Sequence, residues 1–196
     1  MNKVERNENT KPRFNGAKKS LGQNFLTSKK VVGEIIEAGE ITPNDIILEI
    51  GPGRGALTEK LLEVAGKVIA VEKDSRLIEE LNKKFQNFIT AGKLSIISGD
   101  ILEIPLKNLS LLDGKYKVVA NIPYYITGQL LRILLSGEIK PTLCVFMLQK
   151  EVAQRIVAKD NKESLLSLSV KVYGEPKYVT KVSKKYFSPQ PKVDSA

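Results

Sequence analysis

Short apolar runs alternate with amphipathic segments along most of this 196-residue chain, and each pair has about the length of a strand followed by a helix. This alternation predicts an α/β domain in which a mostly parallel sheet carries helices on both faces. In sheets of this kind, ligands bind beyond the carboxyl ends of the strands. The predicted strands are 46–50, 67–72, 94–98, 116–120 and 142–148, and the predicted helices that follow them are 56–65, 75–86, 127–136 and 150–158.

Several of the predicted helices have residues at their ends that favour capping. Ser28 is the predicted N-cap of a further helix that precedes the first strand and ends near Gly39, and Asp74 is the predicted N-cap after the second strand. Gly66 is the predicted C-cap of the helix that follows the first strand. The segment 166–172 alternates like a strand, so its pattern alone leaves strand and helix open.

The net charge of +9 is concentrated at the two ends of the sequence. Residues 1–19 and 171–196 each hold six basic and two acidic residues, so each end is +4 and the middle is almost neutral. Residues 1–18 lack apolar periodicity, which predicts a flexible basic arm ahead of one domain at 19–196. Two basic flanks indicate a polyanionic partner, most simply nucleic acid. Charge that only aids solubility is the alternative.

The residue types that are missing or rare exclude several kinds of chemistry. The sequence has no histidine, which removes the usual general base and the usual metal ligand, and Cys144 is its single cysteine. We therefore expect no metal, and a reaction that works by positioning two substrates. Because the sequence shows neither an apolar run of about 18 residues nor a secretory leader, we expect a cytoplasmic protein that does not contact membranes.

A glycine-rich turn joins the first predicted strand to the helix after it, at Gly51-Pro52-Gly53-Arg54-Gly55-Ala56. Glycines in such a turn let the backbone bend sharply and let a cofactor approach closely. Gly51, Gly53 and Ala56 match the dinucleotide-binding pattern, whereas Gly51, Gly53 and Gly55 match the loop usual for S-adenosylmethionine. The loop alone leaves both cofactors open.

Two acidic residues follow the next two predicted strands. Glu72 lies 21 residues beyond Gly51, close to the spacing of an acid that binds ribose hydroxyls, and its charge would repel the 2′-phosphate of NADP. Asp100 lies where a carboxylate could accept a hydrogen bond from the adenine amine of a cofactor. The alternatives are a solvated acid at Glu72 and an ordinary turn residue at Asp100.

The run Asn121-Ile122-Pro123-Tyr124 ends the fourth predicted strand with groups that suit an amine-bearing base. The amide oxygen of Asn121 and a carbonyl in the turn stiffened by Pro123 can both accept from an exocyclic amine, and Tyr124 can stack on the base. A plain turn is the alternative for this run alone. Together with the loop at Gly51 and the acid at Glu72, the run favours methyl transfer to adenine over dehydrogenation.

Five blocks, in this order along the chain, resemble the ribosomal RNA adenine N6,N6-dimethyltransferase family, and specifically its bacterial small-subunit (16S) members. The related erythromycin-resistance methylases share fewer of these blocks. The blocks are Lys19-Ser20-Leu21-Gly22-Gln23-Asn24-Phe25-Leu26, Glu49-Ile50-Gly51-Pro52-Gly53, Asn121-Ile122-Pro123-Tyr124, Met147-Leu148-Gln149-Lys150-Glu151-Val152 and Phe187-Ser188-Pro189-Gln190-Pro191-Lys192-Val193-Asp194-Ser195-Ala196.

The resemblance implies a Rossmann-like, class I S-adenosylmethionine-dependent methyltransferase fold. It also implies that Asn121, Pro123, Tyr124 and Phe187 form the catalytic site, where Tyr124 and Phe187 hold the target adenine between their rings. At 165–173 the resemblance implies a helix. The implied S-adenosylmethionine site is lined by Asn24, Leu26, Gly51, Gly53, Glu72, Asp100 and Asn121.

The implied activity is dimethylation of two adjacent adenines of 16S rRNA in the immature small ribosomal subunit, by a monomeric protein. The family continues past 194–196 with the rest of its last strand and a small helical domain, so we expect a truncated catalytic domain with a raw sheet edge and weakened RNA binding. The alternatives are a non-catalytic RNA-binding factor in ribosome assembly, an NAD-dependent oxidoreductase and, with less support, a DNA adenine methylase.

Overall fold

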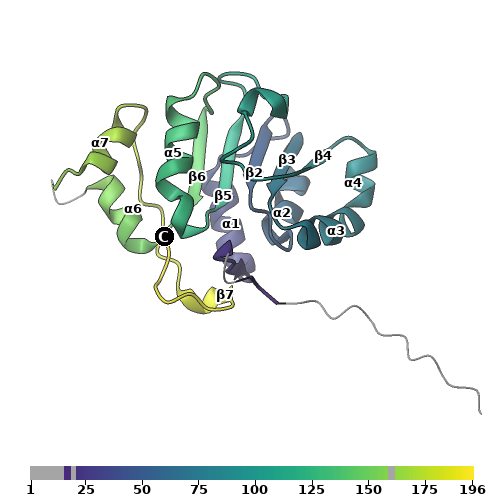
Figure 1. Cartoon of the computed structure of the whole chain (residues 1–196), viewed down its shortest axis with the longest axis horizontal. Coiled ribbons are helices and arrows are strands. Elements are labelled where there is room, and N and C mark those ends of the chain that lie inside the picture. The colour runs from purple at the N-terminus through teal and green to yellow at the C-terminus, as the bar shows by residue number, and fades with distance from the viewer. Residues whose placement is uncertain (1–15, 19–20, 159–161) are drawn as a thin grey trace, which may run out of the picture.

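The computed structural model describes residues 16–18, 21–158 and 162–196, so most of the predicted basic arm at 1–18 lies outside the described residues. Within the described part, five parallel strands form the central sheet in the order β4-β3-β2-β5-β6 (Figure 1). The predicted parallel sheet is therefore confirmed. Its strands are β2 (Ile46–Ile50), β3 (Lys67–Glu72), β4 (Leu94–Ser98), β5 (Lys117–Asn121) and β6 (Leu143–Met147).

The sheet has an apolar layer on each face, which explains why its strands are nearly continuous apolar runs in the sequence. Side chains alternate between the faces along a strand. In β2, Leu48 therefore packs into one apolar cluster and Ile47 into the other, and both are fully buried. A strand buried on one face only would have shown a polar residue at every second position.

Helices cover both faces of the sheet, as predicted. One layer is built against the first four helices and the other against the last three. Figure 1 shows α3 and α4 beside β4 at one end of the molecule and α6 and α7 beyond β6 at the other. The helices are α1 (Lys29–Ala38), α2 (Ala56–Val64), α3 (Ser75–Lys84), α4 (Gln86–Thr90), α5 (Thr127–Ser136), α6 (Lys150–Val157) and α7 (Leu165–Lys171).

The two predicted N-caps are confirmed, whereas the predicted C-cap is wrong. The side chain of Ser28 accepts from the Val31 amide, and Asp74 accepts from the Arg76 amide. The C-cap of α2 is Ala65, not Gly66. Gly66 is required for a different reason: a Cβ at this position would overlap the carbonyl oxygen of Pro43 in the turn that precedes β2.

The structure also corrects several predicted boundaries. The predicted helix 75–86 is interrupted at Phe85, which buries its ring in the core and separates α3 from α4. The predicted strand 116–120 is shifted by one residue to Lys117–Asn121, and buried Tyr116, which precedes it, donates its hydroxyl to the carbonyl of Ile139 at 3.0 Å. The predicted strand 142–148 is shorter by one residue at each end, and the predicted helices 56–65 and 150–158 each end one residue earlier. The predicted bounds 46–50, 67–72, 94–98 and 127–136 agree with the structure.

The segment whose sequence pattern left strand and helix open is a helix, α7. Ser164 starts it with a capping box, in which the side chains of Ser164 and Ser167 each accept from the other residue's backbone amide. These two bonds satisfy amides that would otherwise lack partners in the first turn. The helix implied by the family resemblance is therefore confirmed, and it ends at Lys171 rather than at residue 173.

Segments from the two ends of the described chain pair with each other outside the main sheet. The strands β1 (Phe25–Leu26) and β7 (Phe187–Ser188) pair antiparallel as a second, small sheet. β6 is an outer strand of the main sheet. Immediately after β6, Leu148 exchanges two backbone hydrogen bonds with Ala196, so the backbone that follows this outer strand has hydrogen-bond partners.

Among the described residues, none of the helices combines the length and the apolar character needed to cross a membrane.

Candidate functional site

A single pocket at the carboxyl ends of the strands gathers nearly all the predicted site residues. The loops after β2, β3, β4 and β5 form most of its wall, and the N-terminal segment 21–26 closes one side. Its position agrees with the rule that ligands bind beyond these strand ends. The predicted residues that line it are Asn24, Leu26, Gly51, Gly53, Glu72, Asp100, Asn121, Pro123 and Tyr124.

The glycine-rich turn after β2 lets a ligand approach its backbone closely, because no side chain stands in the way at Gly53. Gly53 has φ +60°, a backbone conformation that other residues rarely adopt. A Cβ on Gly53 would lie 3.0 Å from the ring of Phe25, which lines the same pocket. The turn therefore presents bare backbone to the pocket and leads directly into α2.

Glu72 ends β3 and fixes the glycine-rich turn. One carboxylate oxygen accepts from the Gly53 amide at 3.1 Å, and the other accepts from the Asp74 amide at 2.9 Å. Burial raises the pKa of Glu72, while the amides of Asp74 and Gly53 oppose that shift. Each oxygen keeps a further lone pair, so Glu72 can still accept from ligand hydroxyls.

Asp100, after β4, already has two partners at the pocket wall. It accepts from the Leu102 amide at 3.0 Å and from Lys73 Nζ at 2.6 Å. Burial alone would raise the pKa of Asp100, but the bonds from Lys73 and from the Leu102 amide hold it below its ordinary value. Asp100 is therefore a charged acceptor with Lys73 beside it.

Asn121 ends β5, and its side-chain amide has a defined orientation. Its Nδ2 donates to the backbone carbonyl of Asn24, in the N-terminal segment, at 3.1 Å. Because the amide is planar, this bond directs Oδ1 away from Asn24 and leaves it able to accept a hydrogen bond. In the turn that follows, the carbonyl of Pro123 accepts from Ile126 at 3.1 Å.

Of the two predicted aromatic partners, the structure brings one to the pocket. Tyr124 lines it, and its hydroxyl lies 2.8 Å from Ser195 Oγ, which fixes the ring. Phe187 is 5% exposed, pairs with Leu26 between β7 and β1, and does not line the pocket. The predicted clamp of Tyr124 and Phe187 is therefore not assembled around this pocket.

Glu49, a further acid of the pocket wall beside Glu72 and Asp100, was not identified from the sequence. Glu49 lies in β2, is 1% exposed, and its Oε2 has no hydrogen-bond partner in the described part of the chain. Burial raises its pKa to about 8, and the nearby charge of Glu72 adds to this effect. The sequence signal for this residue is an acidic residue inside an apolar run that predicts a strand buried on both faces.

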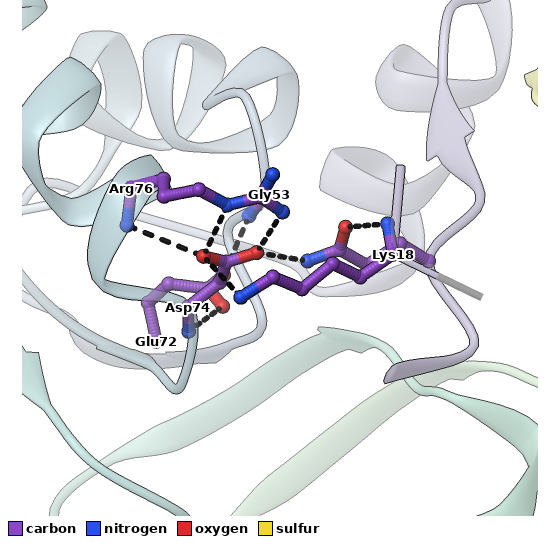
Figure 2. A network of polar contacts seen from close by, with 6 residues as sticks. Lys18, Gly53, Glu72, Asp74 and Arg76 are labelled. Carbon is purple, nitrogen blue, oxygen red and sulfur yellow. Dashed lines mark hydrogen bonds and ion pairs between the residues drawn. The ribbon is translucent and has the colours of Figure 1, made fainter. Parts of the chain in front are cut away.

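The sequence analysis also missed a polar network beside the pocket. Figure 2 shows Asp74 between Lys18 and Arg76, next to Glu72. Gln23 also donates to Asp74, from the N-terminal segment that lines the pocket. Asp74 was predicted only as a helix cap, because nothing in the sequence indicates a contact with a residue 51 positions earlier.

Reactive side chains of other kinds are not part of this site. Burial raises the pKa of the Cys144 thiol in β6 to about 12, so the thiol stays protonated at neutral pH. Within the described ranges, no group of three or more acids, cysteines or histidines is placed to hold a metal ion. The site therefore consists of backbone groups, carboxylates, side-chain amides, aromatic rings, apolar side chains and the basic side chains of Arg54 and Lys73.

Comparison with known proteins places this arrangement in a family. A family profile described as "Ribosomal RNA adenine dimethylase" matches residues 14–196. The chain belongs to the ribosomal RNA adenine dimethylase family. Its relatives within this family include "Ribosomal RNA small subunit methyltransferase A" of Dehalococcoides mccartyi (strain CBDB1), which is 47% identical over 180 residues. That match covers 92% of this chain and 61% of the relative, so the chain spans less than two thirds of the length of this relative.

Solved structures show the same fold for this member of the dimethylase family. A dimethyladenosine transferase from Plasmodium falciparum has a TM-score of 0.74 at 36% identity, covering 87% of this chain and 60% of that one. The 23S rRNA methyltransferase ErmE has a TM-score of 0.76 at 29% identity, covering 88% of this chain and 67% of that one. The chain therefore has a Rossmann-like, class I methyltransferase fold, as predicted.

Proposed function

We propose that this domain transfers methyl groups from S-adenosylmethionine to the exocyclic amines of two adjacent adenines in 16S rRNA, giving N6,N6-dimethyladenosine in the immature small ribosomal subunit. The observation that carries the proposal is the orientation of Asn121. Its Nδ2 is engaged by Asn24, so its Oδ1 is available to accept from an amine in the pocket. The names of its relatives support the RNA substrate.

The residues of the pocket fit S-adenosylmethionine. Glu72 can accept from the two ribose hydroxyls, Asp100 is a charged acceptor for the adenine amine, and the bare backbone at Gly51 and Gly53 allows close approach. Asn24 and Leu26 would contact the ligand from the N-terminal segment. When bound, S-adenosylmethionine supplies an electrophilic methyl group.

The chain's own contribution to the reaction is to prepare the amine of the target adenine. This amine is a weak nucleophile, because its lone pair is delocalised into the ring. Two acceptors that bind its N–H groups favour a more tetrahedral nitrogen and stabilise the positive charge that develops there. Oδ1 of Asn121 is one acceptor. A backbone carbonyl in the turn stiffened by Pro123 is the second; the carbonyl of Pro123 itself accepts from Ile126 and keeps a further lone pair.

The target base also needs an aromatic surface, because leaving the RNA stack removes its neighbours. Tyr124 supplies one, with its ring fixed by the bond to Ser195. The second half of the clamp, Phe187, rests on the family resemblance alone. It requires the β1–β7 pair to turn the ring of Phe187 toward the pocket when RNA binds.

The partner in this proposal is the 16S rRNA of the immature small subunit. A net charge of +9 suits an RNA partner, because phosphate contacts supply most of the affinity of such complexes. The same proposal makes the protein a cytoplasmic monomer.

The test is incubation of the purified chain with immature small subunits and methyl-labelled S-adenosylmethionine, followed by digestion of the RNA to nucleosides. Label in N6,N6-dimethyladenosine is the expected result. Cofactor and subunit binding without label would indicate a non-catalytic assembly factor instead. Binding of NAD without binding of S-adenosylmethionine, measured by calorimetry, would indicate an oxidoreductase and overturn the proposal.

A further inference from the structure

Asp74 is a buried charge with more partners than a helix cap needs. Its side chain is fully buried, and its Oδ1 accepts both the amide and the Nε of Arg76, at 3.2 Å and 3.0 Å. Its Oδ2 accepts Arg76 Nη2 at 2.7 Å and Gln23 Nε2 at 3.0 Å, and Lys18 Nζ lies 3.6 Å from Oδ1 (Figure 2). The Arg76 guanidinium, helped by Gln23, holds the pKa of Asp74 below its ordinary range.

Two of these partners belong to the N-terminal strap, defined here as residues 21–24 together with Lys18. The side chain of Gln23 connects Lys18 to Asp74, because its Oε1 accepts from the Lys18 amide at 2.7 Å while its Nε2 donates to Asp74. Residues 21–24 all line the pocket. Asp74 therefore anchors the strap to the loop that follows β3, on the wall where Glu72 lies.

The strap in turn sets the orientation of Asn121. Asn24, the neighbour of Gln23, offers the backbone carbonyl that accepts Asn121 Nδ2 at 3.1 Å. The side chain of Asn24 is directed elsewhere, because its Nδ2 donates to the carbonyl of Gly22 at 3.0 Å. A displacement of the strap would therefore take this carbonyl away from Asn121 Nδ2 and release the rotation of the Asn121 amide.

We propose that Asp74 is a positioning residue for the methyl transfer: through Gln23 it holds the strap in the place where Asn24 orients the amide of Asn121. This inference rests on the proposed function, since the oriented amide matters only if an amine is bound. Asp74 touches neither the substrate nor the reacting atoms. Asp74 acts on Asn121 indirectly, because it bonds to Gln23, and the neighbouring Asn24 bonds to the Asn121 amide.

The variant Asp74→Asn separates this role from simple capping of α3. Asparagine caps helices about as well as aspartate, so Oδ1 can still accept from the Arg76 amide. The new Nδ2 would meet both Gln23 Nε2 and Arg76 Nη2, however, and two donors cannot bond to each other. The matched control is Asp45→Asn, which makes the same change at an ion pair with Lys117, 3.0 Å long, at the opposite end of the strands.

The experiment measures the Kd for S-adenosylhomocysteine by calorimetry and kcat for methyl transfer at saturating cofactor, using the full chain. Asp74→Asn should raise Kd roughly 10- to 100-fold, the range for losing a hydrogen bond to a charged group, and should also lower kcat. Asp45→Asn should lower the melting temperature yet leave both values within about twofold. Trypsin cleavage after Lys18 should accelerate in Asp74→Asn and not in Asp45→Asn.

A compensating substitution distinguishes positioning from a general loss of stability. In Gln23→Glu alone, two carboxylates face each other, so cofactor binding should weaken as in Asp74→Asn. In the double variant, which combines Asp74→Asn with Gln23→Glu, the new amide at position 74 can donate to the new carboxylate at position 23. The link is then restored with the donor and acceptor exchanged. The Kd and kcat of the double variant should return to within about fivefold of the wild-type values.

Two results would overturn the inference. One is an Asp74→Asn variant whose Kd and kcat match those of Asp45→Asn. The other is a double variant whose Kd and kcat are the same as those of Asp74→Asn, because a substitution at Gln23 cannot restore a role of Asp74 that is limited to capping α3. Both results presuppose a wild-type chain that binds S-adenosylhomocysteine. If the wild-type chain does not bind it, the proposed function fails first, and the role of Asp74 fails with it.

Discussion

Replacing Glu49 by Gln should abolish a pH-dependent loss of stability that originates inside β2. Glu49 is 1% exposed, and the described residues offer its Oε2 no partner, so the fold favours the protonated acid. Burial raises its pKa from 4.5 to about 8. Gln is neutral at every pH and has nearly the same shape, so it removes the titration and leaves the packing almost unchanged.

The sign follows from the proton count. Below pH 4.5 both folded and unfolded chains hold the proton on Glu49, and its titration does not affect stability. Between pH 4.5 and 8 the unfolded chain loses this proton while the folded chain keeps it, so the free energy of unfolding falls as pH rises. At about 1.4 kcal/mol per pH unit, the loss approaches about 5 kcal/mol as an upper bound. Above pH 8 it levels off.

The measurement is the difference in the free energy of unfolding between Glu49→Gln and wild type, from urea titrations at several pH values between about 5 and 9, a range that spans the folded-state pKa of about 8. This difference should grow in favour of the variant as pH rises and become level near pH 8. The matched control is Glu59→Gln on α2, where an exposed carboxylate pairs with Lys84 at 2.8 Å. That substitution should produce little pH dependence in the same window.

A constant difference across this range would refute the reasoning, because it would show that Glu49 titrates at the same pH in the folded and unfolded chains. A difference that instead falls with rising pH would mean that the fold stabilises the carboxylate, as it does for Asp74.

Two further substitutions test the pocket. Gly53→Ala places a Cβ on a residue with φ +60°, 3.0 Å from the ring of Phe25. The variant should lose about 1–2 kcal/mol of unfolding free energy in urea titrations and should bind S-adenosylhomocysteine more weakly in calorimetry. Unaltered binding would contradict the close-contact role of the loop. Tyr124→Ala should raise the KM for the RNA substrate roughly 5- to 150-fold, the equivalent of about 1–3 kcal/mol of stacking, with cofactor affinity unchanged. Tyr124→Phe, which loses only the bond to Ser195, should retain most of the RNA affinity, and an equal loss in both variants would contradict stacking.

The fold could be predicted from the sequence because its local and global patterns agree. Apolar runs bounded by turns mark the strands, and glycines mark the turn that opens α2, so the parallel sheet and the position of the pocket both follow. The acids at the strand ends were found by spacing, since the sheet brings consecutive carboxyl ends to one edge. The family blocks then indicated which cofactor this pocket suits.

The sequence could not predict features that depend on contacts between distant segments. Gly66 resembles a C-cap, but its need for glycine arises from the Pro43 turn that packs against it. The break at Phe85 arises because its ring is buried against the core. The same limitation applies to Asp74, whose partner Gln23 lies 51 positions away.

The role of Phe187 shows the limit of carrying a residue over from a family. Its block at the C-terminal end resembles the family closely, yet the structure buries this ring at the β1–β7 pair rather than in the pocket wall. A sequence block fixes the identity of a residue but not the direction of its side chain. The second face of the base clamp therefore remains a prediction.

The central claim is that Asn121 presents an acceptor to the amine of an rRNA adenine. The most direct test is mass spectrometry of 16S rRNA from immature small subunits after incubation with S-adenosylmethionine and either the wild-type chain or Asn121→Ala. The wild-type chain should yield N6,N6-dimethyladenosine at two adjacent positions, and the variant should yield almost none while its cofactor affinity is only partly reduced. Equal yields from the two chains, or a wild-type chain that binds cofactor and subunits but leaves these adenines unmodified, would contradict the claim.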